Sequence, residues 1–382
     1  MPILTTTAHQ VYCVYIQQCG WGLEGTMMTA PIVLNHCLYK ISIEDSKIEL
    51  IKPQDDRDLK EFSRIIIDEL IESPRTKQYS FTDDNELVVS HIRSIAKNEF
   101  LDGITDKKKN WVMRTESIAK KLLDEEILAQ QKISAMNKKI QKGSLLILHL
   151  EHEGLIKFVL LKIEVDSFFD EVDARIRNGL PLNKKRLQKS CLVTLGQDLE
   201  ISQLLLSDSN RSIREYWWSG FLNSKEVINS TVNTRIAYGA IDRFLKQTVR
   251  NESPADYLFM RNDVNSYFRN NDTFVHEELV EKLQAHKIEN EELNKKFPEV
   301  INRLKSLPSS EKATFDTQFD LDSEVIKTKI KSTIVLDENL ELRIKGEIVN
   351  IEEVIKAESD AHGKYIKIYS DKGYDTFSKK GN

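Results

Sequence analysis

The sequence predicts an α+β protein, with an antiparallel sheet flanked by helices and a helix-rich C-terminal part that ends in a small sheet. Two observations predict this class. Apolar stretches bounded by turn residues recur in the first half of the chain, as is typical of strands. Stretches with apolar residues at helical spacing flank them and dominate the second half. The 382 residues are enough for two domains, since a domain takes roughly 100–200 residues.

The composition is that of a globular protein. Hydrophobic residues make up 40% of the chain and charged residues 30%. No apolar run approaches the roughly 20 residues that a membrane-spanning helix needs, so no membrane span is expected. The net charge of −5 gives no whole-chain support to nucleic-acid binding.

Residues 1–30 differ from the rest of the chain and are expected to be an unstructured extension. Glu24 is their only charged residue, and they show neither a helical period nor the basic and apolar regions of a signal peptide. Met27 and Met28 stand just before a strand-like run. We therefore hypothesise that translation begins at one of these two methionines.

An α/β N-terminal domain is expected over residues 31–223. Residues 32–52 alternate in polarity around the turn residues Glu44–Ser46, which predicts a β-hairpin. Residues 55–72 carry apolar residues at helical spacing and are followed by Pro74, a helix stop.

Two further helices are predicted before the centre of the sheet. They cover Leu87–Phe100 and Glu116–Lys139, with Gly143 as the C-terminal stop of the second helix. The clearest hairpin follows, because the apolar runs Ser144–His152 and Leu155–Ser167 flank the turn dipeptide Glu153-Gly154. Residues 190–195 and 213–219 are predicted as two more strands.

A helical C-terminal domain with a small sheet is expected over residues 224–357. Its predicted helices cover residues 226–248, 254–270, 274–284 and 290–306. Its strand-like stretches are residues 313–319, 324–335 and 340–345, with a turn at Asp337–Asn339. This order is compatible with a winged-helix-like module and with an ordinary α+β cap, of which the cap is preferred. Residues 358–382 are expected to be a flexible tail.

No metal site or active site stands out. Cys13, Cys19, Cys37 and Cys191 lack the paired spacing of structural zinc sites and favour reduced thiols. No phosphate-binding glycine motif and no nucleophile elbow occur. We therefore expect neither cofactor nor metal, and no enzymatic activity.

Two alternatives for metal-dependent chemistry are less favoured by the sequence. His149 and His152 lie three residues apart on a predicted strand, so they point to opposite faces and chelate poorly. A metal-dependent nuclease would need carboxylates such as Asp166, Asp170 and Asp173 to converge on one point.

Positive charge is concentrated in two segments. Residues 103–142 contain ten Lys/Arg against five Asp/Glu, and residues 173–190 contain six against one. Exposed cations of this kind contact DNA phosphates without reading sequence. The candidate DNA-binding residues are Lys107, Lys108, Lys109, Lys184, Lys185 and Arg186. The alternative is that both segments are simply solvated surfaces.

Aromatic residues offer a second kind of contact. Trp111 follows the three consecutive lysines, and Tyr216, Trp217 and Trp218 form a triplet. On a strand, at least one residue of the triplet would face outward for stacking or for a partner. Core packing of two of the three is the preferred interpretation.

Four stretches, in their order along the chain, resemble the NdpA family of nucleoid-associated bacterial proteins. They are Ile32–His36, the hairpin Gly143–Lys162, Arg214–Gly220, and the segment from Phe297-Pro298 to Leu342–Gly346. The resemblance implies a bacterial, cytoplasmic, nucleoid-located protein that binds double-stranded DNA without strong sequence preference. It supplies no catalytic residues.

Two departures from the family leave alternatives open. The N-terminal segment is extra, and the chain is acidic with a lysine-rich middle. A specialised role, such as a component of an anti-phage defence system, stays open, as does a protein–protein adaptor that uses the helix at 116–140 or the aromatic triplet. A homodimer or another protein partner is compatible with either.

Overall fold

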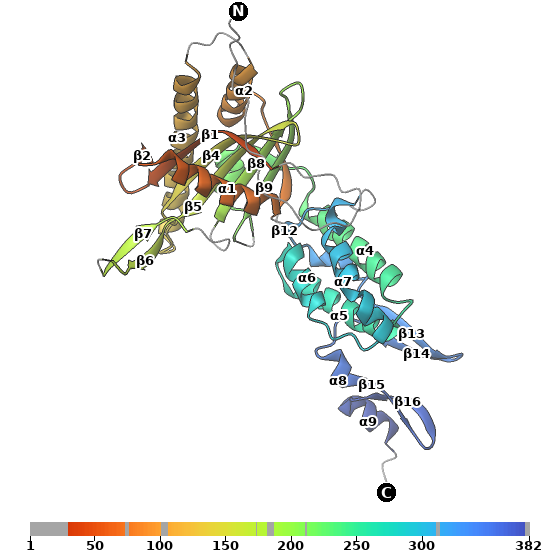
Figure 1. The fold of residues 1–382 in the computed structure, drawn as a ribbon. Coiled ribbons are helices and arrows are strands. Elements are labelled where there is room, and N and C mark those ends of the chain that lie inside the picture. Colours follow the sequence, from red (N-terminus) through yellow and green to blue (C-terminus); the bar gives the residue numbers. More distant parts are fainter. Residues whose placement is uncertain are drawn as a thin grey trace, which may run out of the picture.

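The computed structural model describes residues 30–72, 76–100, 106–172, 174–181, 187–210, 212–310 and 314–378. Its architecture is α+β, as predicted: a sheet unit, a helical unit and a C-terminal ribbon follow one another along the molecule (Figure 1). The expected extension, including Met27 and Met28, lies almost wholly outside the described residues.

The sheet unit is built on eight antiparallel strands in the order β10-β3-β9-β8-β5-β4-β1-β2. Their bounds are β1 Ile32–Ser42, β2 Lys47–Leu50, β3 Lys77–Phe81, β4 Gly143–His152, β5 Leu155–Glu164, β8 Leu187–Leu195, β9 Ile201–Asp208 and β10 Ser224–Glu226. The two predicted hairpins form its centre and one edge. The turn between β4 and β5 has positive φ at both Glu153 (55°) and Gly154 (72°), which suits a tight hairpin.

Alternation along the strands gives the sheet two buried faces. Leu145 and Ile147 point to one face, where they pack with α2 (Leu87–Phe100) and α3 (Lys107–Ser134). Leu146 and Leu148 point to the other, where α1 (Asp56–Glu72) covers them. Because both faces are covered, the central strands are almost continuously apolar.

The boundaries of α3 differ from the prediction. The helix begins at Lys107 rather than Glu116, because Asp106 caps it by accepting a hydrogen bond from the Lys109 amide (2.9 Å). It ends at Ser134, and the chain reverses at Asn137, which has a φ of 54°. Gly143 is therefore the first residue of β4 and not the stop of the helix.

The strand predicted at residues 213–219 was wrong. Residues Tyr216–Phe221 form a single π-helical turn, η2, in which the Leu222 amide donates to the Trp217 carbonyl (3.1 Å). Helical winding brings Trp217 against Phe221, with ring centroids 4.9 Å apart, and buries both. Burial of these two rings outweighs the strand preference of the aromatic residues.

The strand predicted from Leu155 to Ser167 is in fact split. β5 ends at Glu164, and the chain then forms a separate ribbon of β6 (Asp166–Asp170) and β7 (Arg175–Gly179). This ribbon projects from the sheet unit (Figure 1).

The helical unit has its own core. Its helices are α4 Ser230–Thr248, α5 Pro254–Asn270, α6 His276–Gln284 and α7 Glu291–Lys305, and its first small sheet pairs β11 Thr273–Val275 with β12 Gln318–Asp320. The predicted helix from residue 226 begins at Ser230, because Asn229 caps it and β10 occupies the preceding residues. Among the described strands, β13 (Ser332–Asp337) and β14 (Leu340–Ile344) pair only with each other, around the predicted turn. This separate ribbon favours the ordinary α+β cap over a winged helix.

The two units meet where β3 and β9 approach β12. The Gln318 side-chain amide donates to the carbonyls of Asp208 (2.9 Å) and Asn210 (2.8 Å), and Asp316 accepts from the Gln78 amide (2.8 Å). β10 pairs with β3 although it follows residue 223. We therefore propose a domain boundary between β10 and α4.

The expected tail carries regular structure. After α8 (Ile351–Val354), β15 (Ile355–Asp360) pairs with β16 (Gly363–Ile368), and α9 (Asp371–Phe377) follows. Nearly every side chain of this segment is exposed. Its expected flexibility as a unit stays a prediction.

Candidate nucleic-acid interface

The first predicted cation group lies at the start of α3. Lys107, Lys108 and Lys109 are all exposed in the first turn, directly after the capping residue Asp106. The amino end of a helix carries partial positive charge, so three lysines there reinforce its attraction for anions. This geometry suits contact with a phosphate.

The second predicted group, Lys184, Lys185 and Arg186, lies outside the described residues. Only the first of the two groups can therefore be placed on the fold. Of the other cations in that segment, Lys189 is buried on β8, and Arg177 pairs with Asp170 (2.8 Å). Arg175 is exposed on β7.

The aromatic residues do not line this surface. Trp111 is buried beneath the lysines and stacks beside His149, with centroids 6.3 Å apart. Trp217 is fully buried, whereas Tyr216 and Trp218 are partly buried against the same core. The triplet therefore packs into the core, and base stacking by it is not supported.

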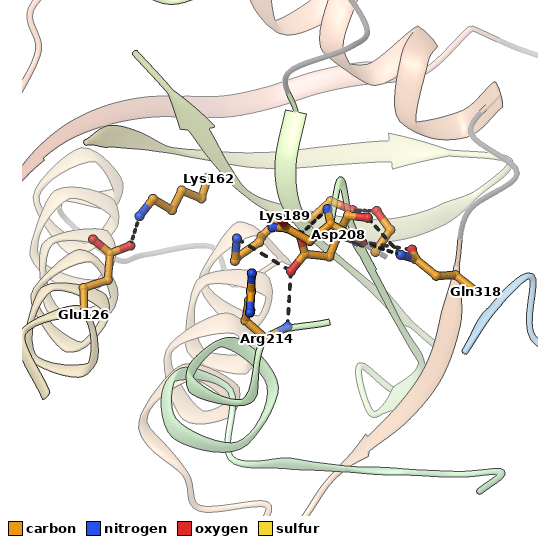
Figure 2. Close-up of polar contacts among 9 residues, drawn as sticks. Glu126, Lys162, Lys189, Asp208, Arg214 and Gln318 are labelled. Carbon is orange, nitrogen blue, oxygen red and sulfur yellow. Dashed lines mark hydrogen bonds and ion pairs between the residues drawn. The ribbon is translucent and has the colours of Figure 1, made fainter. Parts of the chain in front are cut away.

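Buried charges cluster on the α3 face of the sheet (Figure 2). Lys162 on β5 forms an ion pair with Glu126 of α3, and both side chains are almost fully buried. On the neighbouring strands, the Lys189 ammonium lies 3.6 Å from the Asp208 carboxylate. A buried charge is tolerated only when it is paired in this way.

Asp208 also forms hydrogen bonds with the residues that follow it and with the helical unit. Its carboxylate accepts from the Asn210 amide (2.9 Å) and the Arg214 amide (3.2 Å), while its backbone bonds Gln318 of the helical unit. Burial lowers the pKa of Lys189, and the nearby Asp208 opposes that shift.

A perturbed lysine beside a carboxylate would suit catalysis if substrate could reach it. Lys162 and Glu126 are only 1% exposed, and Lys189 and Asp208 are 4% and 2% exposed. We interpret these two buried ion pairs as structural contacts and not as a catalytic site.

The two metal alternatives can be followed only in part, because Asp173 lies outside the described residues. His149 is buried and stacks on Phe158 (centroids 4.5 Å apart), and burial lowers its pKa to about 4. His152 faces the opposite side of β4, as predicted. No group of three or more His, Cys, Asp or Glu side chains gathers at a point suited to a metal ion in the described ranges.

The cysteine prediction can be followed for two of the four residues. Cys37 and Cys191 are buried free thiols, and burial raises the pKa of Cys37 to about 12. A thiol with so high a pKa is inert. Cys13 and Cys19 lie outside the described residues.

The sequence reading missed one basic surface, on α4. Arg235, Arg243 and Lys246 are exposed on this helix, and Arg250 follows just after its end. The signal was available in the spacing of these cations over a predicted helix. These cations are dispersed in sequence and form no run, so the charge of a short segment does not reveal them.

No helix within the described ranges has both the length and the apolar character to cross a membrane.

A search of the curated proteins finds no match to the chain. The sequence profile of one family, described as Nucleoid-associated protein YejK, matches residues 52–376. That match spans the sheet unit from α1 onward, the helical unit and most of the C-terminal ribbon. The chain therefore belongs to the nucleoid-associated YejK/NdpA family.

Proposed function

We propose that the protein binds double-stranded DNA at the bacterial nucleoid, in the cytoplasm, without strong sequence preference and without catalysing a reaction. Family membership is the observation that carries this proposal. The proposed contacts run from Lys/Arg side chains to phosphates, at Lys107, Lys108, Lys109, Lys184, Lys185 and Arg186.

The start of α3 supports this mode of binding. Its three lysines are exposed and consecutive, so they present cations around the end of a helix rather than along a groove-reading face. Contacts of this kind position a protein on the duplex but carry no sequence information.

The experiment compares DNA binding by two triple variants at several salt concentrations. Neutralising Lys107, Lys108 and Lys109 to Ala should weaken binding to all duplexes alike and make the salt slope shallower by about 0.9 per lost phosphate contact. Neutralising Arg57, Lys60 and Arg64 on α1 is the matched control, because these exposed cations already pair with carboxylates.

Equal binding by the Lys107–Lys109 variant and the wild type would refute this part of the interface. A full variant that also changes Lys184, Lys185 and Arg186 tests the remaining half. Cleavage of the DNA in the presence of Mg²⁺ would contradict the non-enzymatic part of the proposal.

The second candidate function is that of a protein–protein adaptor, and the β6–β7 ribbon favours it. Phe168 (50%), Phe169 (64%), Val172 (92%) and Ile176 (76%) are exposed on it. A lone two-stranded ribbon is only marginally stable in water, so a covering chain would stabilise it. Light scattering on the wild type and on a Phe168→Ser/Phe169→Ser variant tests this candidate. Loss of an assembly in the variant would support it, and a monomeric wild type that captures no partner would exclude it.

A further inference from the structure

The exposed side of α4 carries a stripe of positive charge. At 100° per residue, Arg235, Arg243 and Lys246 fall within about 80° of one another around the helix axis, and Arg250 follows just after the helix ends. All four side chains are exposed. We name the stripe the α4 basic face, and it consists of three cations on one side of the helix with Arg250 at its end.

These cations are not neutralised by neighbours. Within the part of the chain that the structure describes, none of the four has a carboxylate at ion-pair distance. Asp242, the only acidic residue of α4, is engaged by Arg261, whose Nε lies 2.6 Å from the carboxylate. Arg250 lies over the Tyr257 ring, 5.8 Å from its centroid, a contact that leaves its charge in place. The positive potential of the α4 basic face is therefore available to an external anion.

Three other exposed cations of the same unit pair with carboxylates. Lys295 pairs with Glu292 (2.7 Å), Lys296 with Glu252 (2.8 Å), and Lys327 with Glu324 (2.5 Å). The α4 basic face thus differs from these three positions, where each cation is offset by a neighbouring carboxylate.

A glycine lies in the middle of the face. Gly239 is at the centre of α4, and a side chain added there would meet no atom within 4 Å. Glycine is among the poorest helix formers, and packing inside the chain gives no reason for it here. A surface that must come close to the helix backbone between the cations does give a reason.

We propose that the α4 basic face docks on the phosphate backbone of double-stranded DNA, with Gly239 allowing close approach. The inference rests on the proposed DNA-binding function and adds a contact surface on the helical unit. From Arg235 to Lys246 the helix rises about 17 Å at 1.5 Å per residue, and Arg250 follows just after its end. That is less than the roughly 34 Å turn of a duplex, so one DNA molecule can reach all four cations.

The chemistry of the face favours phosphate over other anions. Three of the four cations are arginines, whose planar guanidinium forms two parallel hydrogen bonds with a phosphate. Gln247 is the only exposed amide side chain on α4, so the helix offers little for reading base edges. Binding through this face is therefore independent of sequence.

The first test neutralises charge on the full chain. The variant Arg235→Gln/Arg243→Gln/Lys246→Gln should lose roughly five- to tenfold in duplex affinity per phosphate contact near 0.1 M salt, and its salt slope should fall by about 2.7. The control Lys295→Gln/Lys296→Gln/Lys327→Gln removes as many charges from the same unit and should bind nearly as the wild type does.

The second test separates the docking role of Gly239 from a folding role. Gly239→Leu introduces a better helix former and should leave Tm unchanged or raise it by about 1–3 °C. The same variant should bind duplex DNA at least several-fold more weakly. Full DNA binding by this variant would overturn the close-approach argument.

The outcomes distinguish the two proposals. A wild-type protein that binds no duplex at low salt would overturn the proposed function itself. A wild type that binds, together with an α4 variant that matches its control, would overturn only the inference about α4. An α4 variant that binds duplex DNA as the wild type does but no longer binds an acidic polypeptide would likewise overturn the inference about α4. That result would assign the face to a protein partner.

Discussion

At the residue scale, the buried ion pairs explain why charged side chains occur inside apolar strands. Lys162 and Glu126 are sealed between β5 and α3, and each neutralises the other. Glu126→Leu alone should destabilise the fold by about 3–5 kcal/mol, because it leaves Lys162 buried without a partner.

The double variant Glu126→Leu/Lys162→Met provides the control. Replacing both charges with apolar groups should restore most of the lost stability. Urea unfolding measures each variant. A Glu126→Leu variant as stable as the wild type would contradict the assignment of Glu126 and Lys162 as a buried ion pair.

His149 makes the folded state sensitive to acid. Burial lowers its pKa to about 4 from the ordinary 6.5, so the unfolded chain binds the additional proton between these values. The stabilising contribution is complete above pH 6.5 and is lost as the pH falls toward 4. Between pH 7 and pH 5 the loss should be about 2 kcal/mol.

The variant His149→Phe keeps an aromatic ring stacked on Phe158 and removes the titrating group. Its free energy of unfolding should therefore fall less steeply from pH 7 to pH 5 than that of the wild type. His276 is also buried with a pKa of about 4 and should retain its own contribution. Equal slopes for the two proteins would exclude His149 as a contributor.

Single residues were predictable from the sequence only where local pattern decides their place. The opposite directions of His149 and His152 follow from strand alternation. The ion-pair partners of Lys162 and Lys189 do not follow from any local pattern, because Glu126 comes from a helix and Asp208 from a different strand. Such pairs depend on tertiary contact, which composition and spacing do not encode.

At the element scale, the π-helical turn η2 packs its aromatic residues into the core on the α3 face of the sheet unit. Trp217 is fully buried against Phe221, whereas Trp218 is half-buried beside Tyr79. Trp217→Ala should destabilise the fold by about 3–5 kcal/mol, since it opens a cavity in the core.

Trp218→Ala is the matched control and should be less destabilising, because its ring is already partly in solvent. Thermal unfolding followed by circular dichroism compares the two variants. A larger effect at Trp218 than at Trp217 would contradict the burial that η2 gives them.

Elements with strong turn or capping chemistry were predicted well. The helices at Leu87–Phe100 and Pro254–Asn270 match their predictions, and so do the two hairpins of the sheet. The first turn of α3 was missed because three lysines interrupt the apolar period. The turn η2 was missed because a run of aromatic residues is typical of a strand.

At the scale of the whole molecule, a small set of hydrogen bonds couples the sheet unit to the helical unit. Gln318 satisfies the carbonyls of Asp208 and Asn210 at this junction. Gln318→Ala should cost about 1–3 kcal/mol, because buried polar groups lose their partner. The expected result is a separation of the unfolding of the two units.

Differential scanning calorimetry resolves this prediction. The wild type should unfold with more overlap between the transitions of its two units than the Gln318 variant. Ser212→Ala, which removes an exposed hydrogen bond to Asp320, is a control at the same junction. Identical thermograms for the wild type and Gln318→Ala would show that Gln318 does not couple the units.

The distribution of charge also appears only at this scale. The net charge of −5 does not reveal the two local positive surfaces, which are the lysines at the start of α3 and the α4 basic face. The lysines could be proposed from the sequence because they are consecutive. The α4 basic face could not be separated from ordinary surface, since it depends on which carboxylates the fold brings near these cations among the described residues.

The most direct test of the account is binding of the purified wild-type protein to labelled duplexes of unrelated sequence across a salt series. The account predicts similar affinities for all duplexes, intact DNA, and an affinity that falls linearly on a log–log plot with a slope of about −0.9 per phosphate engaged. No binding at low salt, or binding of one sequence alone with little dependence on salt, would contradict it.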